Sequence, residues 1–209
     1  MTEKSDPNTV TDLASLEALV GQVGEASIRK EVSFLHPIYR EWISKSPFAV
    51  LATVGPSGLD VSPRGDPAPL VTIVDDHTLL LPERRGNNRI DSLRNILVDP
   101  RVALLFLIPG IRETLRVNGR ARISVDPQLL ERLSMNGAPP KCVLEIKVEA
   151  VFCQCARALI RSTLWAPPDA ETLATVPTIG AMLDALTNSE IDGAEYDKAL
   201  PARQRETLY

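Results

Sequence analysis

Two short segments of this 209-residue chain combine arginine with residues that leave backbone N–H groups accessible. They are residues 62–67 (SPRGDP) and residues 84–89 (RRGNNR), and each follows an apolar run typical of a strand. The end of a buried strand has no need of arginine, whereas a phosphate group is bound by guanidinium forks and backbone N–H groups. The pattern therefore predicts a small phosphorylated ligand at the end of a sheet.

Each segment also has a simpler interpretation. Asn87 and Asn88 precede a predicted helix over residues 89–98, where asparagine is a good N-cap and the first-turn N–H groups bind anions. The alternative is a capped helix on a surface loop. Gly65 permits close backbone approach beside Arg64, and the alternative there is an ion pair between Arg64 and Asp66 within the turn.

A third polar group lies on a predicted strand over residues 114–123. Alternation places Thr114, Arg116 and Asn118 on one face of that strand. This face is either the solvent side of a half-exposed strand or a polar wall that hydrogen-bonds a flat heterocycle.

A fourth group, Arg157, Arg161 and Trp165, has a spacing of four residues. On a predicted helix over residues 154–164 this spacing makes one stripe. Two arginines at that spacing repel each other unless an anion or an acid faces them, so the stripe predicts a ligand contact or an inter-subunit salt bridge.

The elements that must position these residues are mostly short strands with hairpin-length connections, which favours an antiparallel barrel. Strands are predicted at residues 48–54, 59–62, 70–74, 78–81, 102–108, 114–123 and 142–152. Further helices are predicted at residues 12–20, 33–44 and 126–133.

Composition restricts the classes of function. A net charge of −4 argues against a nucleic-acid binder, although residues 60–122 hold 10 arginines against 8 acids. No stretch approaches the roughly 20 apolar residues of a membrane span. Three cysteines and no signal-peptide pattern predict a cytoplasmic protein without disulfides, and two histidines make a zinc site at Cys153 and Cys155 a poor interpretation. Without a nucleophile–base motif, any chemistry is expected to come from a cofactor.

Taken together, the segments resemble the pyridoxamine 5′-phosphate oxidase-related family of FMN-binding split-barrel proteins, in an uncharacterised bacterial branch. The matching residues are 48–67, the LLLP block with residues 86–89, residues 99–106 (DPRVALLF) and residues 113–121 (ETLRVNGRA). The resemblance covers residues 35–165 and implies a mainly β (α+β) fold, a six-stranded antiparallel split β-barrel with flanking helices. It also implies a homodimer with FMN at the subunit interface.

On this resemblance, Arg64 and Arg89 hold the FMN phosphate, and Thr114 contacts the flavin of the partner subunit. The residues expected at the cofactor are Arg64, Gly65, Leu81, Pro82, Asn87, Asn88, Arg89, Ser92, Thr114, Arg116, Arg157, Arg161 and Trp165. The sequence departs from the pyridoxamine-phosphate oxidases at residues 69–71 (PLV), where they carry a lysine, and it lacks their C-terminal Arg-x-His element. We therefore do not expect vitamin B6 oxidation.

The sequence thus predicts an FMN-dependent oxidoreductase acting on an unidentified small substrate. The alternatives are a deazaflavin (F420)-dependent reductase on the same fold, or a flavin or haem carrier or sensor without turnover. The expected organisation is an N-terminal helical extension (1–34), the barrel (35–165) and a helical, polar C-terminal tail (166–209) that packs on the barrel.

Overall fold

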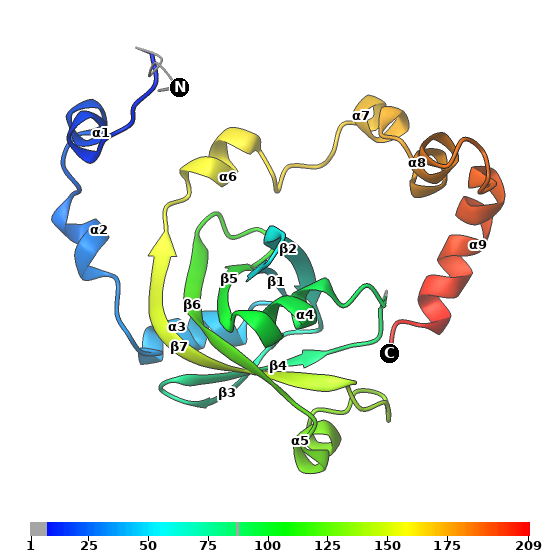
Figure 1. Cartoon of the computed structure of the whole chain (residues 1–209), viewed down its shortest axis with the longest axis horizontal. Helices are drawn as coiled ribbons and strands as arrows, with labels where there is room; N and C mark the ends of the chain where they lie inside the picture. The colour runs from blue at the N-terminus through cyan, green and yellow to red at the C-terminus, as the bar shows by residue number, and fades with distance from the viewer. Residues whose placement is uncertain (1–7, 87) are drawn as a thin grey trace, which may run out of the picture.

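The computed structural model describes residues 8–86 and 88–209 and confirms the mainly β, antiparallel split-barrel fold (Figure 1). The described strands form one seven-stranded sheet of order β2-β1-β5-β6-β7-β4-β3, in which every neighbouring pair is antiparallel. The resemblance implied six strands, and the seventh here belongs to the short β3–β4 hairpin at one edge. The strands are β1 Phe48–Gly55, β2 Gly58–Gly65, β3 Thr72–Asp75, β4 Thr78–Glu83, β5 Arg101–Leu107, β6 Thr114–Ser124 and β7 Cys142–Gln154.

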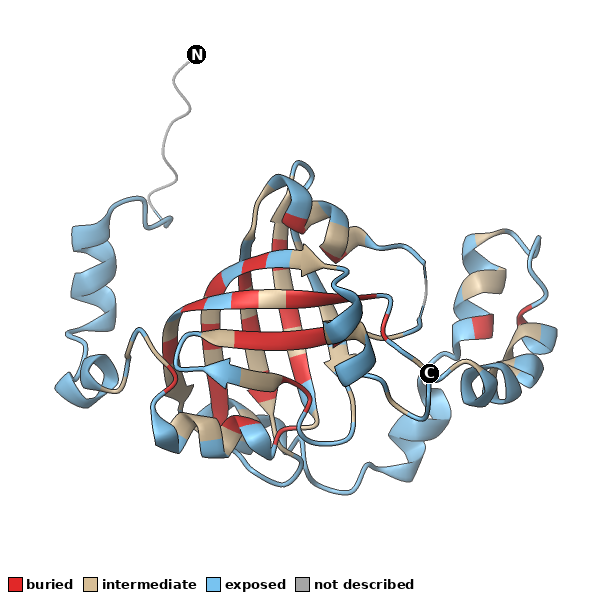
Figure 2. Ribbon diagram, turned by 90° about the horizontal axis from the view of Figure 1, so that it is seen from below, coloured by how far each residue is buried: buried red, intermediate tan, exposed pale blue. Residues whose placement is uncertain are grey.

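The barrel interior is filled by every second residue of its strands (Figure 2). In β1, Ala49 and Leu51 are fully buried, and β5 contributes Leu104 and Phe106 in the same alternation. Burying one such large side chain is worth about 1.5–3 kcal/mol. The period of two therefore fixes which face of each strand points inward, and with it the direction of every polar residue between the apolar ones.

The two longest strands bend where they pair. The register of β6 against β7 shifts between Asn118 and Gly119, which is a β-bulge. A Cβ atom on Gly119 would lie 2.2 Å from the carbonyl oxygen of Lys147, so only glycine fits this close backbone approach. The bend allows one continuous sheet to wrap around the core.

One helix packs against the barrel beside the predicted phosphate segments. Helix α4, Asp91–Val98, buries Ser92 and Ile96 against the sheet. Asn95 Nδ2 donates to Thr53 Oγ1 at 3.0 Å. A Cβ atom on Gly55 would lie 1.9 Å from Asn95 Oδ1, so the glycine at the end of β1 leaves the space that α4 needs.

Several helix boundaries differ from the predictions. Helix α3, Pro37–Ser44, begins at Pro37 rather than at residue 33, because the His36 side chain caps it and a proline is favoured in the first turn. The helix predicted at residues 154–164 is wrong in extent: β7 continues to Gln154, and α6 covers only Arg157–Ser162. The remaining helices are α1 Leu13–Val20, α2 Glu25–Arg29, α5 Pro127–Arg132, α7 Ala170–Thr175, α8 Ile179–Leu186 and α9 Gly193–Glu206.

The terminal helices lie on opposite sides of the barrel, α1 and α2 on one side and α8 and α9 on the other (Figure 1, Figure 2). Helices α8 and α9 pack against each other through Gly180 and Gly193, where a Cβ on Gly180 would lie 2.0 Å from the Gly193 carbonyl oxygen. Asp197 of α9 accepts hydrogen bonds from the Thr178 hydroxyl and the Gly180 N–H, which ties the start of α8 to α9. No helix within the described part of the chain is long and apolar enough to cross a membrane.

Candidate functional site

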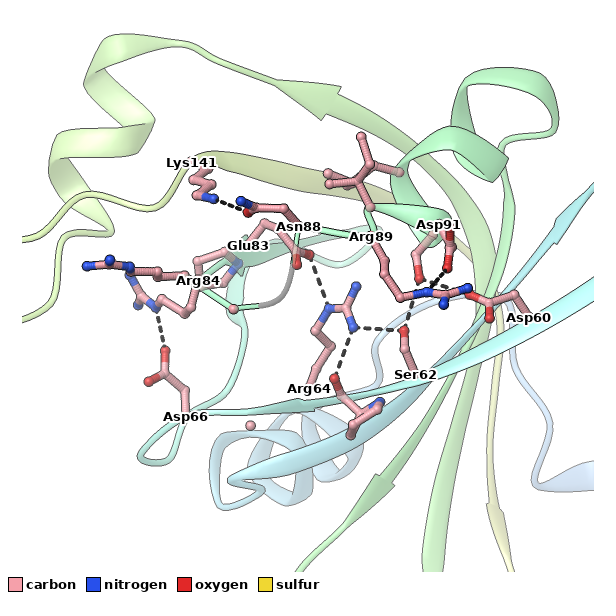
Figure 3. Close-up of a pocket in the computed structure, with 18 of the residues that line it drawn as sticks. Asp60, Ser62, Arg64, Asp66, Glu83, Arg84, Asn88, Arg89, Asp91 and Lys141 are labelled. Carbon is pink, nitrogen blue, oxygen red and sulfur yellow. Dashed lines mark hydrogen bonds and ion pairs between the residues drawn. The ribbon is translucent and has the colours of Figure 1, made fainter. Parts of the chain in front are cut away.

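The two arginine-bearing segments meet at one cavity, of about 490 Å³ (Figure 3). Its walls are residues 60–65 of β2, the end of β4, the loop that leads to α4, the first turn of α4, and Lys141 just before β7. The sheet order separates β2 from β4 by four strands, so closure of the barrel is what brings these segments together.

Arg64 donates three hydrogen bonds from its guanidinium to other residues at the cavity. It lies within β2, on the inward face, because its partner in β1 is the core residue Ala49. Its Nε donates to Glu83 Oε2 at 3.1 Å, and its Nη1 donates to Ser62 Oγ at 2.8 Å and to the Pro63 carbonyl at 2.9 Å. The side chain is only 15% exposed. The alternative of a turn pair with Asp66 is therefore wrong.

A chain of hydroxyl groups continues from Arg64 to helix α4. Ser62 Oγ lies 2.9 Å from Ser92 Oγ, and Ser92 Oγ donates to Asp60 Oδ2 at 3.3 Å. Asp60, Ser62 and Arg64 alternate along β2, which places all three on its inward face. The wall beside Arg64 thus holds two hydroxyl groups, which hydrogen-bond to each other and to Asp60 here and would have to rotate to donate to an anion.

The second enclosed arginine is already committed to other partners. Arg84 Nε donates to Asp66 Oδ2 at 2.8 Å, and its Nη1 donates to the Leu133 carbonyl at 2.6 Å. Both side chains of this ion pair are largely buried, at 16% and 3% exposure. The Tyr209 hydroxyl reaches the other Asp66 oxygen at 3.2 Å. Arg84 therefore shapes the wall, and its partner Asp66 ties the C-terminal segment to it.

The cap predicted for α4 is wrong. The helix starts at Asp91, and its N-cap is Ile90, which has a positive φ of 55° and no side-chain cap bond. Asn88 instead accepts a hydrogen bond from Lys141 Nζ at 2.8 Å, and Asn87 lies outside the described residues. A β-branched residue in this backbone region is strained by about 1–3 kcal/mol, and such strain concentrates at functional sites.

Arg89 lies at the rim of the cavity. Its Nε donates to Asp91 Oδ2 at 2.8 Å, and the side chain is 78% exposed. This hydrogen bond raises the pKa of Arg89 above its ordinary value. Arg89 is thus a permanent but solvent-screened charge, unlike Arg64.

The charges of the lining nearly balance. The cations are Arg64, Arg84, Arg85, Arg89 and Lys141, and the acids are Asp60, Asp66, Glu83 and Asp91. Behind this wall, burial and the nearby Glu83 carboxylate raise the pKa of the Cys142 thiol. The cavity is therefore positive by one charge, with its cations and acids interleaved.

The remaining predicted residues divide between the cavity and other places. Gly65, Pro82 and Ser92 line the cavity, whereas Leu81 is a core residue with no exposed surface. Arg157 and Arg161 are exposed on α6, outside the cavity lining. Trp165 lies beyond the end of α6 and donates from Nε1 to the Ile111 carbonyl at 2.7 Å. The predicted stripe is therefore broken, because the helix ends before Trp165.

Thr114 and Arg116 lie on the outer face of the sheet. Arg116 pairs with Leu105 and Phe152, in the register positions between core residues, so it points away from the barrel interior and from Arg64. Its guanidinium lies 4.1 Å from the centre of the Phe152 ring. Its Nε is buried and makes no hydrogen bond to any described residue. Thr114 Oγ1 lies 3.3 Å from Gln154 Oε1.

Sequence reasoning missed five polar residues of the cavity as partners: Asp60, Ser62, Glu83, Asp91 and Lys141. The alternation that placed Thr114 and Arg116 on one face also applies to β2 and would have placed Asp60 and Ser62 beside Arg64. Glu83 and Lys141 depend on the pairing of β4 with β7, which no local pattern in the sequence reveals.

The sequence model of the family described as Pyridoxamine 5′-phosphate oxidase matches residues 35–155, more than half of the chain. The protein therefore belongs to the pyridoxamine 5′-phosphate oxidase family, as the resemblance predicted. No curated protein is similar enough to this chain to count as a match.

Solved structures give matches of low identity. A single-residue variant of HupZ from Group A Streptococcus is 20% identical, with a TM-score of 0.48 over 57% of this chain and 99% of that one. A candidate pyridoxamine 5′-phosphate oxidase from Lactobacillus delbrueckii is 23% identical, with a TM-score of 0.46 over 58% and 95%. An FAD-binding protein from Mesorhizobium loti is 15% identical, with a TM-score of 0.40 over 57% and 94%. At these values the neighbours do not indicate what this chain binds.

Proposed function

We propose that this protein binds FMN in the cavity beside Arg64 and acts as a flavin-dependent oxidoreductase on a small substrate. The observation that carries the proposal is the enclosed Arg64 guanidinium, 15% exposed, with the Ser62 and Ser92 hydroxyls next to it. A phosphate monoester needs such a set of charged and neutral donors. The cavity volume of about 490 Å³ lies within the range of cofactor sites, about 300–1,000 Å³.

In this proposal the residues of the chain bind and orient, and the cofactor supplies the redox chemistry. Arg64 donates to the phosphate group, Ser62 and Ser92 add hydroxyl donors, and Lys141 and Arg89 contribute positive charge from the rim. When bound, FMN supplies hydride or electron transfer. Family membership supports a flavin, because the resemblance assigns FMN to this class of barrel, and it leaves the second substrate open.

We further propose that the site is shared between two chains of a homodimer. The outer face of the sheet is a half-exposed row of side chains that includes Val50, Leu105, Arg116 and Phe152, with Pro63 at its edge. A second copy packed on this face would cover the apolar row. It would also bring Thr114 and Arg116 of each chain toward the cavity of the other chain.

The test is binding of FMN, FAD and riboflavin to the purified protein by calorimetry. We expect FMN to bind most tightly, because only FMN offers a single terminal phosphate to Arg64. Equal affinity for FMN and riboflavin would contradict a phosphate site. The visible spectrum of freshly purified protein separates the alternatives: flavin absorbs near ~450 nm, whereas a Soret band would indicate haem and a deazaflavin spectrum an F420-dependent reductase. A cytoplasmic location is part of the same proposal, since Cys142, Cys153 and Cys155 are free thiols.

A further inference from the structure

The arginine best placed for an anion is already paired with a carboxylate. Arg64 Nε donates to Glu83 Oε2 at 3.1 Å, and the two side chains are only 15% and 21% exposed. Figure 3 shows the Arg64 guanidinium between Glu83 and Ser62, inside the cavity. In such an enclosed place charges are weakly screened, so a bound phosphate and the Glu83 carboxylate would compete for the same guanidinium.

The fold keeps Glu83 in this position. Glu83 is the last residue of β4 and pairs with Cys142 of β7, so its backbone is fixed by the sheet. Its side chain is part of the cavity lining. The main-chain N–H of Lys141, the residue before Cys142, also donates to the Glu83 carbonyl at 3.0 Å. The sheet therefore fixes the backbone of Glu83 at the cavity wall, and the hydrogen bond to Arg64 orients its carboxylate toward the guanidinium.

The other enclosed arginine cannot take over the phosphate. Arg84 is held by Asp66 and by the Leu133 carbonyl, and both contacts are shorter than 3 Å. Of the two enclosed arginines, Arg64 is thus the one available to a phosphate group, and the strength of that contact depends on the charge next to it.

We propose that Glu83 is a specificity-determining residue of the anion site. Its negative charge weakens the hold of Arg64 on a phosphate group and limits the charge that the cavity accepts, which favours a single phosphate monoester over a diphosphate. This inference rests on the proposed function, in which the ligand is a phosphate monoester. Glu83 thus gives the cavity a lower affinity for anions than Arg64 alone would give it.

The substitution Glu83→Gln tests charge separately from geometry. Glutamine keeps an oxygen that accepts from Arg64 Nε and occupies the same volume, so the guanidinium keeps its orientation while the charge is removed. If Glu83 served only to orient Arg64, this change would leave anion binding unaltered.

The experiment is calorimetric titration of the wild type and Glu83→Gln with inorganic phosphate, pyrophosphate, FMN and riboflavin. We expect Glu83→Gln to bind phosphate and FMN about tenfold more tightly, because the repulsion between two like charges a few ångströms apart in an enclosed place is of this order. The gain in affinity should be larger for pyrophosphate, and the affinity for riboflavin should not change. The matched control is Glu145→Gln, which removes the 2.7 Å pair of Arg122 with Glu145 outside the cavity. It should change none of these affinities.

The outcomes separate the two proposals. Equal or weaker phosphate and FMN binding by Glu83→Gln would overturn the role of Glu83 and leave flavin binding intact. Tighter phosphate binding without any FMN binding would support Glu83 and overturn the flavin proposal. Failure of all three proteins to bind phosphate or FMN would overturn both. Thermal unfolding of each variant confirms that it is folded.

Discussion

At the scale of single residues, the surroundings of an arginine decide what it can do. Arg64 and Arg89 belong to the same cavity and both pair with an acid, yet their exposures are 15% and 78%. An exposed pair is screened by water and salt, whereas an enclosed guanidinium keeps most of its interaction with an anion. The two residues that the resemblance assigns equally to the phosphate are therefore not equivalent in the structure.

We predict that Arg64→Ala weakens FMN binding by about 10- to 100-fold, because a charged hydrogen bond is worth about 1.5–3 kcal/mol. Arg89→Ala should weaken it by less than Arg64→Ala, at a given ionic strength. Fluorescence titration of FMN measures both. Arg101→Ala, which removes the exposed pair with Asp99 outside the cavity, is the control. A larger loss in Arg89→Ala than in Arg64→Ala would contradict this ranking.

The partners of these arginines show what a sequence reveals and what it does not. The presence of Arg64 at the cavity was predictable, because strand ends with arginine and glycine are a local pattern. Its partner was not: Glu83 is 19 residues away and meets Arg64 only after the barrel closes. Likewise, the Asn87–Asn88 pair is a strong local capping signal, but the N-cap residue of α4 is Ile90. The Asn88 side chain instead accepts a hydrogen bond from Lys141.

At the scale of elements, strands were more predictable than helix ends. Alternation located β1, β5, β6 and β7 within a few residues, since each has one face in the core. Helices near the C-terminus were not resolved by pattern, because α9 has a weak apolar face and contains Pro201. The caps at Asp169, Thr178 and Asp192 are the signals that would have located α7, α8 and α9.

The contact of α4 with β1 sets the position of the first turn of α4, and hence of Ser92 in the cavity wall. We predict that Gly55→Ala destabilises the protein by about 1–3 kcal/mol, because the new methyl group displaces Asn95 and leaves the buried Thr53 hydroxyl without its partner. Urea unfolding measures the change.

The control for this prediction is the double variant Gly55→Ala with Asn95→Ala. Once Asn95 is truncated, the methyl group meets no side chain beyond Cβ, so Gly55→Ala should cost less than about 0.5 kcal/mol in that background. Additive costs of the two substitutions would show that Asn95 is not what excludes a side chain at position 55.

At the scale of the whole molecule, the two groups of predicted cofactor residues lie on opposite faces of one sheet. Arg64 belongs to the row with Ala49, Phe106 and Leu115, which faces the core, and Arg116 belongs to the row with Leu105 and Phe152, which faces outward. One chain cannot bring both rows to one ligand. Two chains related by a two-fold axis can, and they would form two equivalent sites.

This arrangement predicts complementation between two defective chains. Arg64→Ala removes the phosphate contact of a chain's own cavity, and Thr114→Arg places a bulky charge at the buried position that the chain would present to its partner's cavity. Each homodimer should bind FMN poorly. The heterodimer is purified through two different tags. The cavity of its Arg64→Ala chain faces the substituted Thr114 of the other chain, so that site carries both defects, whereas the second site has Arg64 and Thr114 unchanged. About one FMN per dimer should therefore bind with wild-type affinity. Fluorescence titration gives this stoichiometry, and sedimentation checks the assembly: a flavin-loaded monomer of 22.8 kDa would rule out a shared site.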